Sequence, residues 1–275
     1  MQPPLSPHTP ANWDAASRGY AEVVSTRLME PFADALLERL EADVSMKALE
    51  VAAGTGALTL NLAPRVESLL ATDFAPKMIE VLRECLSAMG HTNVTCEVMD
   101  GQALSVDDAS FDRAACSFAL MLFPDRTLGF SELRRVLRPG GRAAVSGWAG
   151  PDEFEAFAIF LQALRAAFPD LPAPPGPPPV FSLADPASFA AEMEAAGFTD
   201  VGVDKASREL VFESFEDVWA MLTAGAPPIQ ALFNRTGPGG KERVRDALAQ
   251  IIDDRFGGGP IRFTNTATIG YGVAG

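Results

Sequence analysis

Basic side chains are scarce in this sequence of 275 residues: 22 lysines and arginines stand against 36 aspartates and glutamates, so the formal net charge is −14. An acidic protein repels phosphate groups, which argues against a surface for nucleic acid or an anionic membrane. Hydrophobic residues make up 48% of the chain, a share typical of a globular protein and too high for a disordered one. The length suits one large α/β domain or two small ones. Small-molecule chemistry is the function class that remains.

Cysteine is rare as well. Cys85, Cys96 and Cys116 form no CxxC pair, which excludes a disulfide scaffold and fits a reducing, cytoplasmic compartment. The N-terminus lacks the basic and apolar segments of a signal peptide, so none is predicted. The longest apolar run, residues 114–123, has about half of the ~20 residues that a membrane helix needs. We therefore expect a buried strand there and no membrane span.

Only two histidines are present, His8 and His91. His8 lies in a proline-rich tail and His91 in a loop before an expected strand, so we expect both at the surface. The sequence offers neither a Ser/His/Asp triad nor a cluster of metal ligands. We therefore name no catalytic residue and expect no metal site.

Proline, in contrast, is abundant. Half of the 22 prolines lie in two short stretches, residues 1–10 and 169–179. The remainder of the chain is not proline-rich, so these stretches mark a tail and a linker.

Between residues 46 and 148, apolar runs alternate with amphipathic stretches. We expect helices at 76–90 and 125–138, and strands at 46–52, 66–73, 93–100, 111–120 and 142–148. Strands that are apolar on both faces and alternate with helices indicate a parallel sheet covered on both sides. Ligands of such sheets bind beyond the carboxyl ends of the strands, so the residues after each strand are the candidates for a site.

The flanking regions are more irregular. Residues 13–40 predict one or two amphipathic helices with a break near Pro31. After residue 150 we expect helices at 153–168 and 186–198, a strand at 201–212, helical residues from 215 to 256 with interruptions at 225–228 and 237–240, and a last strand at 261–274.

The strongest local signal is LEVAAGTG, residues 49–56, where a strand turns into a helix. Gly54 and Gly56 allow a ligand to approach the backbone closely, and the new helix offers free N–H groups to an anion. Glu50 adds a negative charge at the end of the strand. A ligand with both a carboxylate and an amine would suit this turn, although such a turn can also be a plain tight connection.

Two further acids end strands. Asp73 follows Gly56 by 17 residues, where a carboxylate can accept both hydroxyls of a ribose. Asp100 ends the third strand and is placed to accept from an exocyclic amine. Each acid can instead be a helix cap or a turn residue. Three acids that end three successive strands favour a ligand site.

Together the segments LEVAAGTG, ATDFAPKMIEVLRE, VMDGQAL, FDRAACSFALMLF and ELRRVLRPGGR resemble the class I S-adenosylmethionine-dependent methyltransferases, in particular the small-molecule branch with the ubiquinone and menaquinone biosynthesis enzymes. They lie within residues 46–148, in the family's order and spacing. The resemblance implies an α/β, Rossmann-like, doubly wound and mostly parallel seven-stranded sheet with a reversed last strand and a helical lid. It implies one domain, 1–275: tail and helical flap at 1–45, cofactor-binding core at 46–150, lid or substrate insertions at 151–185 and 212–260, and the remaining core at 186–211 and 261–275.

The resemblance also implies a site for S-adenosyl-L-methionine and its product S-adenosyl-L-homocysteine. Tyr20 is expected to close over the methionine carboxylate or, alternatively, to be a packing residue. The other expected contacts are Glu50, Ala52, Gly54, Thr55 and Gly56 at the methionine end, Asp73 at the ribose, Phe74 and Met78 at the adenine, Asp100, Gly101 and Gln102 at the adenine edge, and Ser117 and Phe118 beneath the sulfonium.

Two departures from the family's pattern matter. Ala52 stands where the E-x-G-x-G-x-G turn has its first glycine. After the fourth strand comes Ala119-Leu120-Met121, without the Asp of a magnesium-dependent catechol enzyme or the Asn-Pro-Pro-Tyr of an amino-methylase. We therefore expect metal-independent, in-line methyl transfer to the carbon, oxygen or nitrogen atom of a small aromatic or lipophilic acceptor.

The regions after the fifth strand are expected to form a lid and an acceptor pocket, with core packing as the alternative for each aromatic residue. The candidates are Trp148, Phe154, Phe157, Phe181, Trp219, Phe233 and Phe263. An NAD(P)-dependent oxidoreductase is a second hypothesis, weakened because Thr59 stands where a third glycine is wanted. A catalytically silent S-adenosylmethionine-binding protein is a third. The expected partner is the acceptor molecule, and a second copy of the chain in a homodimer is a further partner that the sequence neither indicates nor excludes.

Overall fold

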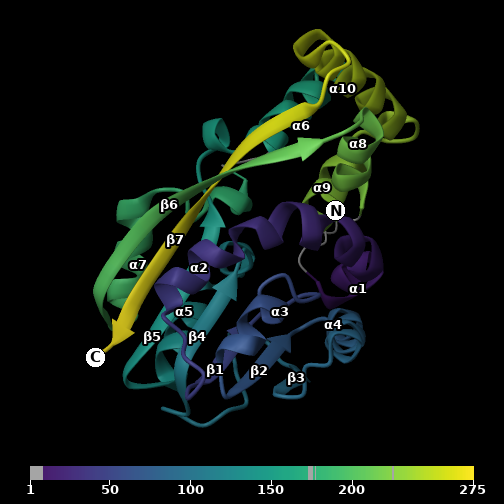
Figure 1. Cartoon of the computed structure of the whole chain (residues 1–275). Coiled ribbons are helices and arrows are strands. Elements are labelled where there is room, and N and C mark those ends of the chain that lie inside the picture. The colour runs from purple at the N-terminus through teal and green to yellow at the C-terminus, as the bar shows by residue number, and fades with distance from the viewer. Residues whose placement is uncertain (1–8, 173–175, 177, 225) are drawn as a thin grey trace, which may run out of the picture.

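The computed structural model describes residues 9–172, 176, 178–224 and 226–275. Seven strands form one sheet in the order β3-β2-β1-β4-β5-β7-β6, as Figure 1 shows. The strands are β1 (Lys47–Val51), β2 (Ser68–Asp73), β3 (Val94–Val98), β4 (Phe111–Ser117), β5 (Leu137–Trp148), β6 (Phe198–Phe212) and β7 (Ile261–Ala274). The pairs among β1 to β5 are parallel, whereas β7 is antiparallel to both β5 and β6. The predicted sheet with its reversed last strand is confirmed.

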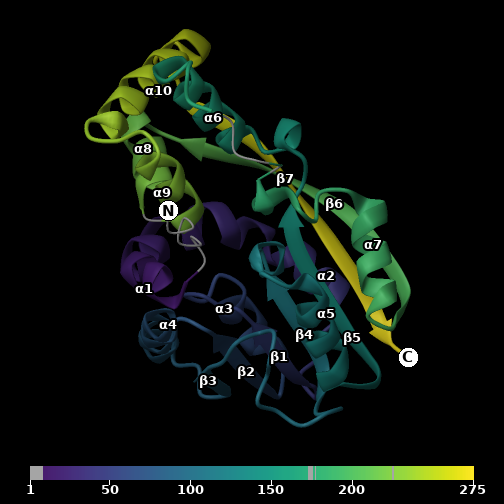
Figure 2. The same cartoon turned by 180° about the vertical axis from the view of Figure 1, so that it is seen from behind.

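Helices cover both faces of the sheet. Figure 1 shows α2 (Ala33–Leu40) in front of the strands, and the opposite view in Figure 2 brings forward α5 (Arg126–Val136) and α7 (Pro186–Ala195). α4 (Pro76–Met89) packs against β2 and β3. The apolar residues of the central strands β1 and β4 are therefore buried on both sides, as expected of a doubly wound sheet.

Local sequence signals account for the helix starts and ends. Asp125 and Asp185 cap α5 and α7 by accepting from the backbone N–H groups of Leu128 and Ser188. α4 begins with Pro76 and ends at a glycine in the left-handed conformation, two signals that the sequence shows directly.

The N-terminal helical region breaks near Pro31 as predicted. α1 (Pro10–Gly19) continues into a π-helix at Tyr20–Met29 and a 3₁₀ turn at Glu30–Phe32, before α2 begins. A π-helix of ten residues is unusual, and π-helical segments occur often at functional sites. Nothing in the amphipathic pattern distinguishes it from an α-helix.

Two core elements differ from their predicted form. The helix after the Gly54–Gly56 turn is short: α3 (Thr59–Leu62) passes into a 3₁₀ turn, Ala63–Arg65, that contains a proline. β5 begins at Leu137, five residues earlier than expected, because Leu137 already pairs with Phe111 of β4. The pairing register then shifts around the Pro139-Gly140-Gly141 turn.

The last two strands run beyond the sheet and carry helices at their far end, as both Figure 1 and Figure 2 show. These helices are α6 (Glu155–Ala167), α8 (Phe215–Thr223), α9 (Pro227–Asn234) and α10 (Gly240–Phe256). α6 packs on α10, and α8 contacts the π-helix. Outside the described residues lie 1–8, residues 173–175 and 177 of the predicted linker, and Gly225 in the first predicted interruption.

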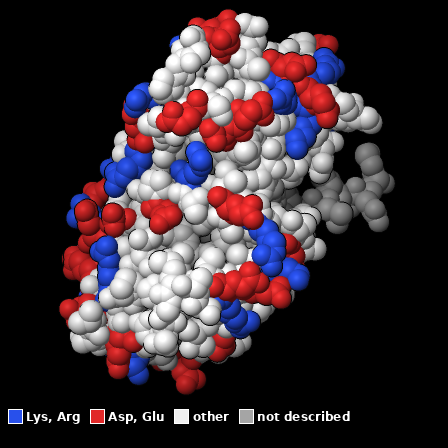
Figure 3. All heavy atoms as spheres, turned by 45° about the vertical axis from the view of Figure 1, so that its right-hand side comes forward, with Lys and Arg blue, Asp and Glu red and all other residues white. Residues whose placement is uncertain are grey.

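In the described ranges, every helix is too short or too polar to cross a membrane. On the face in Figure 3, acidic side chains are interspersed with basic ones, and no broad basic patch forms on this side.

Candidate functional site

A cavity of about 510 Å³ opens at the carboxyl ends of the parallel strands. Its floor comes from the segments after β1, β2, β3 and β4, and its roof from α1 and the π-helix. Ligand pockets of small molecules fall in the range of roughly 300–1,000 Å³. The structure brings together at this cavity every predicted site residue except Gly56, namely Tyr20, Glu50, Ala52, Gly54, Thr55, Asp73, Phe74, Met78, Asp100, Gly101, Gln102, Ser117 and Phe118.

Gly56 does not line the cavity, so its predicted ligand contact stays a prediction. Its φ is +106°, and a Cβ there would lie 2.7 Å from Cδ1 of Leu82 on α4. Glycine at this position thus lets the turn pack against α4. Gly54, with φ +56° and open space where a Cβ would point, faces the cavity instead. Ala52 adopts φ +56° although it is not glycine, a strained conformation of the kind found at binding sites.

Asp73 connects the ends of β1 and β2. One carboxylate oxygen accepts from the backbone N–H of Gly54 at 2.9 Å, and the other accepts from the N–H of Ala75 at 2.9 Å. The side chain is buried, and burial raises its pKa to about 6 in spite of these two bonds. A carboxylate oxygen can accept more than one hydrogen bond, so Asp73 can still accept ligand hydroxyls from the cavity side.

Glu50 is only 1% exposed, and Oε2 accepts from the Thr59 hydroxyl at 2.7 Å. Burial, together with a smaller contribution from the charge of Asp73, raises the pKa of Glu50 to about 8. Within the described part of the chain, no lysine or arginine forms an ion pair with Glu50. A ligand cation such as an amine would supply the missing partner.

Thr55 gives an independent indication of a ligand. Its hydroxyl oxygen is buried at the cavity and has no hydrogen-bond partner among the described residues. Buried polar atoms in proteins are almost always hydrogen-bonded. The acids, the open Gly54 backbone and this hydroxyl fit a polar ligand with an amine and several hydroxyl groups.

The N-terminal residues form the roof. The ring of Tyr20 contacts that of Trp13 edge to face at 5.6 Å, and burial together with Asp73 raises the pKa of the Tyr20 hydroxyl, which stays neutral. Asp14 accepts from the backbone N–H of Lys77 at 2.7 Å and so fastens α1 to the start of α4.

Several lining residues were not predicted from the sequence. Among them are Trp13, Ser25, Met29, Met99, Leu122 and Phe123. Trp13 and Tyr20 are seven residues apart, a spacing that places two residues on one face of a helix and could have indicated the pair. Ser25 and Met29 depend on the π-helix, which the sequence pattern does not reveal.

On the opposite wall, Asp100 and Gln102 are engaged with their own segment. The backbone N–H of Gln102 donates to Oδ1 of Asp100 at 2.9 Å, and Oε1 of Gln102 accepts from the N–H of Asp125 at 2.8 Å. Gly101 packs so closely that a Cβ would lie 2.5 Å from Cγ1 of Val51 and 2.8 Å from Cζ of Phe123. Only glycine fits this position without a shift of its neighbours.

A second, smaller cavity of about 80 Å³ adjoins the first. The two share the lining residues Trp13, Tyr20, Met29, Phe118 and Leu122. Of the aromatic residues predicted for an acceptor pocket, Trp148, Phe154 and Phe157 line this second cavity. They continue a row of stacked rings from Phe118, with centroid distances of 4.2, 4.1 and 5.8 Å along the row.

The other four aromatic candidates do not line either cavity. Phe181 packs against the edges of Phe154 and Phe157, and Trp219 packs with Phe233 among the outer helices. Phe263 is fully buried between Phe212 and Phe256. These contacts agree with core packing, the alternative that the sequence left open for them.

His8 lies outside the described residues, and His91 is half-buried beyond the end of α4, away from both cavities. Among the residues that the structure describes, no three of the side chains His, Cys, Asp and Glu gather closely enough to hold a metal ion.

Known methyltransferases resemble this chain in sequence. A family model described as "Methyltransferase domain" matches residues 48–141. A demethylmenaquinone methyltransferase of Deinococcus radiodurans is 32% identical over 164 residues, which cover 55% of this chain and 67% of that protein. One of Mycolicibacterium vanbaalenii is 31% identical over 173 residues, which cover 60% of this chain and 73% of that protein. Other curated relatives match over about half of their own length.

Among solved structures, that of the [4+2]-cyclase SpnF superimposes with a TM-score of 0.61 at 16% identity, covering 98% of this chain and 97% of that one. At this identity the likeness shows the fold alone. The reaction in that protein's name is a cyclisation, so the fold by itself does not specify the chemistry.

Proposed function

Because this chain belongs to the class I S-adenosylmethionine-dependent methyltransferase family, we propose that it methylates a small aromatic or lipophilic acceptor. The observation that carries the proposal is the pair of adjoining cavities. One is lined by buried acids and open backbone, the other is apolar, and Phe118 and Tyr20 belong to both. A polar donor and an apolar acceptor would meet at these shared residues.

In the large cavity, Glu50 and the turn from Ala52 to Thr55 would hold the methionine end of the cofactor. Asp73 would accept from the ribose hydroxyls, and Asp100, Gly101 and Gln102 would lie along the adenine edge. Ser117 and Phe118 would lie beneath the sulfonium. These roles are supported by the arrangement of the residues around one cavity, by the raised pKa of Glu50 and by the unpartnered Thr55 hydroxyl.

The bound cofactor supplies an electrophilic methyl group whose leaving group is a neutral thioether. The chain therefore has to orient the acceptor and exclude water, rather than protonate a leaving group. The described residues that line the second cavity include no Asp, Glu, His, Lys or Arg. An acceptor that needs no protein base suits this lining, for example an electron-rich ring carbon, a neutral amine or an oxygen that is already ionised.

The names of curated relatives favour carbon as the acceptor atom, since two state demethylmenaquinone and a third states a C-methyltransferase of ubiquinone and menaquinone biosynthesis. On this ground we propose that the methyl group is transferred to a ring carbon of the acceptor and that the transfer needs no metal ion. The second cavity is too small for a whole lipophilic molecule. It would hold the reacting ring, and the remainder of the acceptor would require the outer helices to open.

We propose that residues 151–185 and 212–260 act as this lid. Met221, Leu222, Pro228 and Ile229 of α8 and α9 form one wall of the second cavity. Deletion of residues 225–240 should impair acceptor turnover more than cofactor affinity. Equal loss of both would argue against a lid.

Calorimetry tests the cofactor. We expect micromolar or tighter binding of S-adenosylhomocysteine and none of NAD(P)⁺, with binding abolished in Asp73→Ala. If NAD(P)⁺ binds and S-adenosylhomocysteine does not, the oxidoreductase hypothesis takes its place. Transfer of a labelled methyl group to a panel of quinols, phenols and amines then tests catalysis. Tight cofactor binding with no transfer to any acceptor would favour a silent binding protein.

A further inference from the structure

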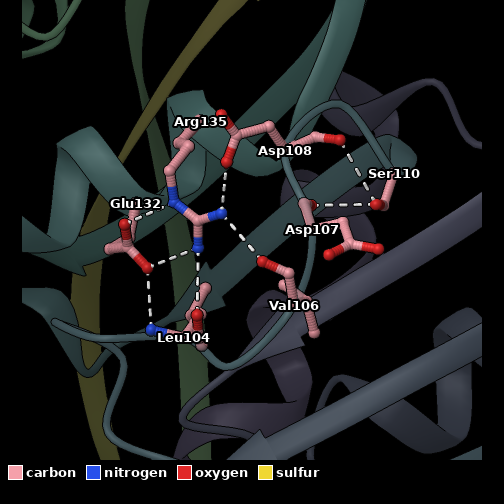
Figure 4. A network of polar contacts seen from close by, with 7 residues as sticks. All are labelled: Leu104, Val106, Asp107, Asp108, Ser110, Glu132 and Arg135. Atoms are coloured by element: carbon pink, nitrogen blue, oxygen red, sulfur yellow. Dashed lines mark hydrogen bonds and ion pairs between the residues drawn. The ribbon is translucent and has the colours of Figure 1, made fainter.

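A polar network joins α5 to the segment that follows β3. This segment, residues 99–110, leads from the carboxyl end of β3 to the amino end of β4, and its first residues line the large cavity. Figure 4 shows Arg135 of α5 reaching into the curve of the segment, with Glu132 of the same helix beside it.

Arg135 donates hydrogen bonds to two backbone carbonyls and two carboxylates. Nη2 donates to the carbonyl of Leu104 at 3.0 Å, and Nη1 donates to the carbonyl of Val106 at 2.8 Å and to Oδ1 of Asp108 at 2.7 Å. Nε and Nη2 donate to the two oxygens of Glu132 at 2.7 and 2.8 Å. The planar guanidinium is the one side chain whose donors fan out to satisfy all of these acceptors together.

Glu132 completes the connection. Its Oε2 also accepts from the backbone N–H of Leu104 at 2.7 Å, so α5 binds both the N–H and the carbonyl of Leu104. This carboxyl is only 16% exposed, and the Arg135 guanidinium holds its pKa below the ordinary value. The network is therefore screened from solvent on the side of Glu132.

The same helix also holds the other end of the segment. The N–H of Asp125, at the start of α5, donates to the side chain of Gln102, which lines the cavity. Gly101 is fixed between Val51 and Phe123. Residues 100–104 are thus held on one side by the start of α5 and on the other by Glu132 and Arg135.

We propose that Arg135, with Glu132, is a positioning residue that preorganises residues 100–104 to recognise the adenine edge of the cofactor. The inference rests on the proposed function, because that proposal places the adenine edge along residues 100–102. Without the guanidinium fork, Leu104 loses its carbonyl partner and the segment becomes looser. Cofactor binding must then order it, which lowers affinity without any change in a residue that touches the ligand.

The variant Arg135→Lys keeps the charge and removes the fork. Calorimetry with two probes is the test: S-adenosylhomocysteine, and S-inosylhomocysteine, in which a carbonyl oxygen replaces the adenine amine. We expect the affinity for S-adenosylhomocysteine to fall about tenfold, because ordering even a few side chains on binding carries a penalty of that size. We also expect the preference for the adenine over the hypoxanthine ligand to narrow, which a purely structural role would not cause.

Arg138→Lys is the matched control. Arg138 pairs with Asp112 at 2.7 Å, also an arginine with a carboxylate, but neither residue lines a cavity. The Arg138→Lys variant should bind S-adenosylhomocysteine with the affinity of the wild type and should prefer it to S-inosylhomocysteine by the same factor. Glu132→Gln serves as the second variant should Arg135→Lys not fold, and it should shift both quantities in the same direction.

The outcomes separate the two proposals. If the wild type does not bind S-adenosylhomocysteine, the proposed function fails and this inference fails with it. If the wild type binds but the folded variants keep both its affinity and its preference, the inference alone is overturned, whatever happens to their melting temperatures.

Discussion

The backbone N–H of Phe118 donates to both the carbonyl and the hydroxyl oxygen of Ser146, at 3.1 and 3.0 Å. Phe118 has φ +52°, a left-handed conformation that is strained for a bulky residue by about 1–3 kcal/mol. Ser146, fully buried on β5, offsets this strain. As a result the ring of Phe118 stacks on Trp148 and forms a wall common to both cavities.

Ser146→Ala should therefore impair methyl transfer more than cofactor binding. The hydroxyl bonds to Phe118 and to the Ser117 hydroxyl are lost while the carbonyl bond remains, so we expect a loss of about 1 kcal/mol of stability. With the Phe118 ring less well fixed, turnover should fall about tenfold, whereas affinity for S-adenosylhomocysteine should change less than threefold. Thermal unfolding, calorimetry and labelled-methyl transfer measure the three quantities.

Ser45→Ala is the control for that variant. Its hydroxyl donates to Oδ1 of Asp43 at 2.8 Å, away from both cavities. Turnover should stay at the wild-type level. Equal turnover of Ser146→Ala and the wild type would show that the position of the Phe118 ring is not set by Ser146.

Glu50→Gln should stabilise the ligand-free protein at alkaline pH. Burial raises the pKa of Glu50 from 4.5 to about 8, so the folded protein holds this proton more tightly than the unfolded chain does. Ionisation of Glu50 therefore destabilises the fold progressively as pH rises from about 4.5 to about 8. The variant avoids this loss, and its amide oxygen can still accept from Thr59.

Melting curves from pH 5 to 8.5 measure this effect. The variant should melt above the wild type at pH 8, by roughly 2–4 °C for each kcal/mol relieved, and the difference should shrink towards pH 5. Glu80→Gln is the control, because a hydrogen bond from Lys77 lowers the pKa of the exposed Glu80 and its ionisation does not oppose folding. A variant that melts below the wild type at pH 8 would contradict a desolvated Glu50.

The sequence predicted the core well because its signals are local. Asp73 ends β2, Gly54 and Asp100 come shortly after β1 and β3, and parallel strands bring their carboxyl ends to one edge. The close packing of Gly56 on Leu82 was not predicted, because Leu82 comes from another helix and no local pattern shows the contact. For the same reason, spacing did not distinguish Phe154, which lines a cavity, from Phe263, which is buried in the outer core.

Cofactor binding should release a proton. At pH 7 the free protein keeps Glu50 largely protonated, because its pKa is about 8. An ammonium group placed beside it favours the carboxylate, so up to about one proton should leave per bound S-adenosylhomocysteine. Affinity should accordingly rise from pH 6 to pH 8.

Calorimetry in buffers of different ionisation enthalpy counts these protons. Glu50→Gln should bind the ligand more weakly and release no proton from this position. Tight binding by the wild type at pH 7 without proton release would mean that the amine does not lie beside Glu50.

Gly19→Ala should disturb the junction between the N-terminal roof and the outer helices. A Cβ on Gly19 would lie 2.6 Å from the carbonyl oxygen of Ala224, just after α8, and a backbone atom cannot turn aside as a side chain can. Alanine favours the helix by about 1 kcal/mol, so the variant should keep α1 intact and displace the end of α8 instead. Since α8 and α9 form a wall of the second cavity, KM for the acceptor should rise about tenfold.

Gly150→Ala, where a Cβ meets nothing within 4 Å, is the matched control and should leave KM unchanged. Affinity for S-adenosylhomocysteine should stay within twofold in both variants, because Gly19 and Gly150 lie outside the lining of the large cavity. An unchanged acceptor KM in a folded Gly19→Ala protein would show that the roof and the outer helices do not act together on the acceptor.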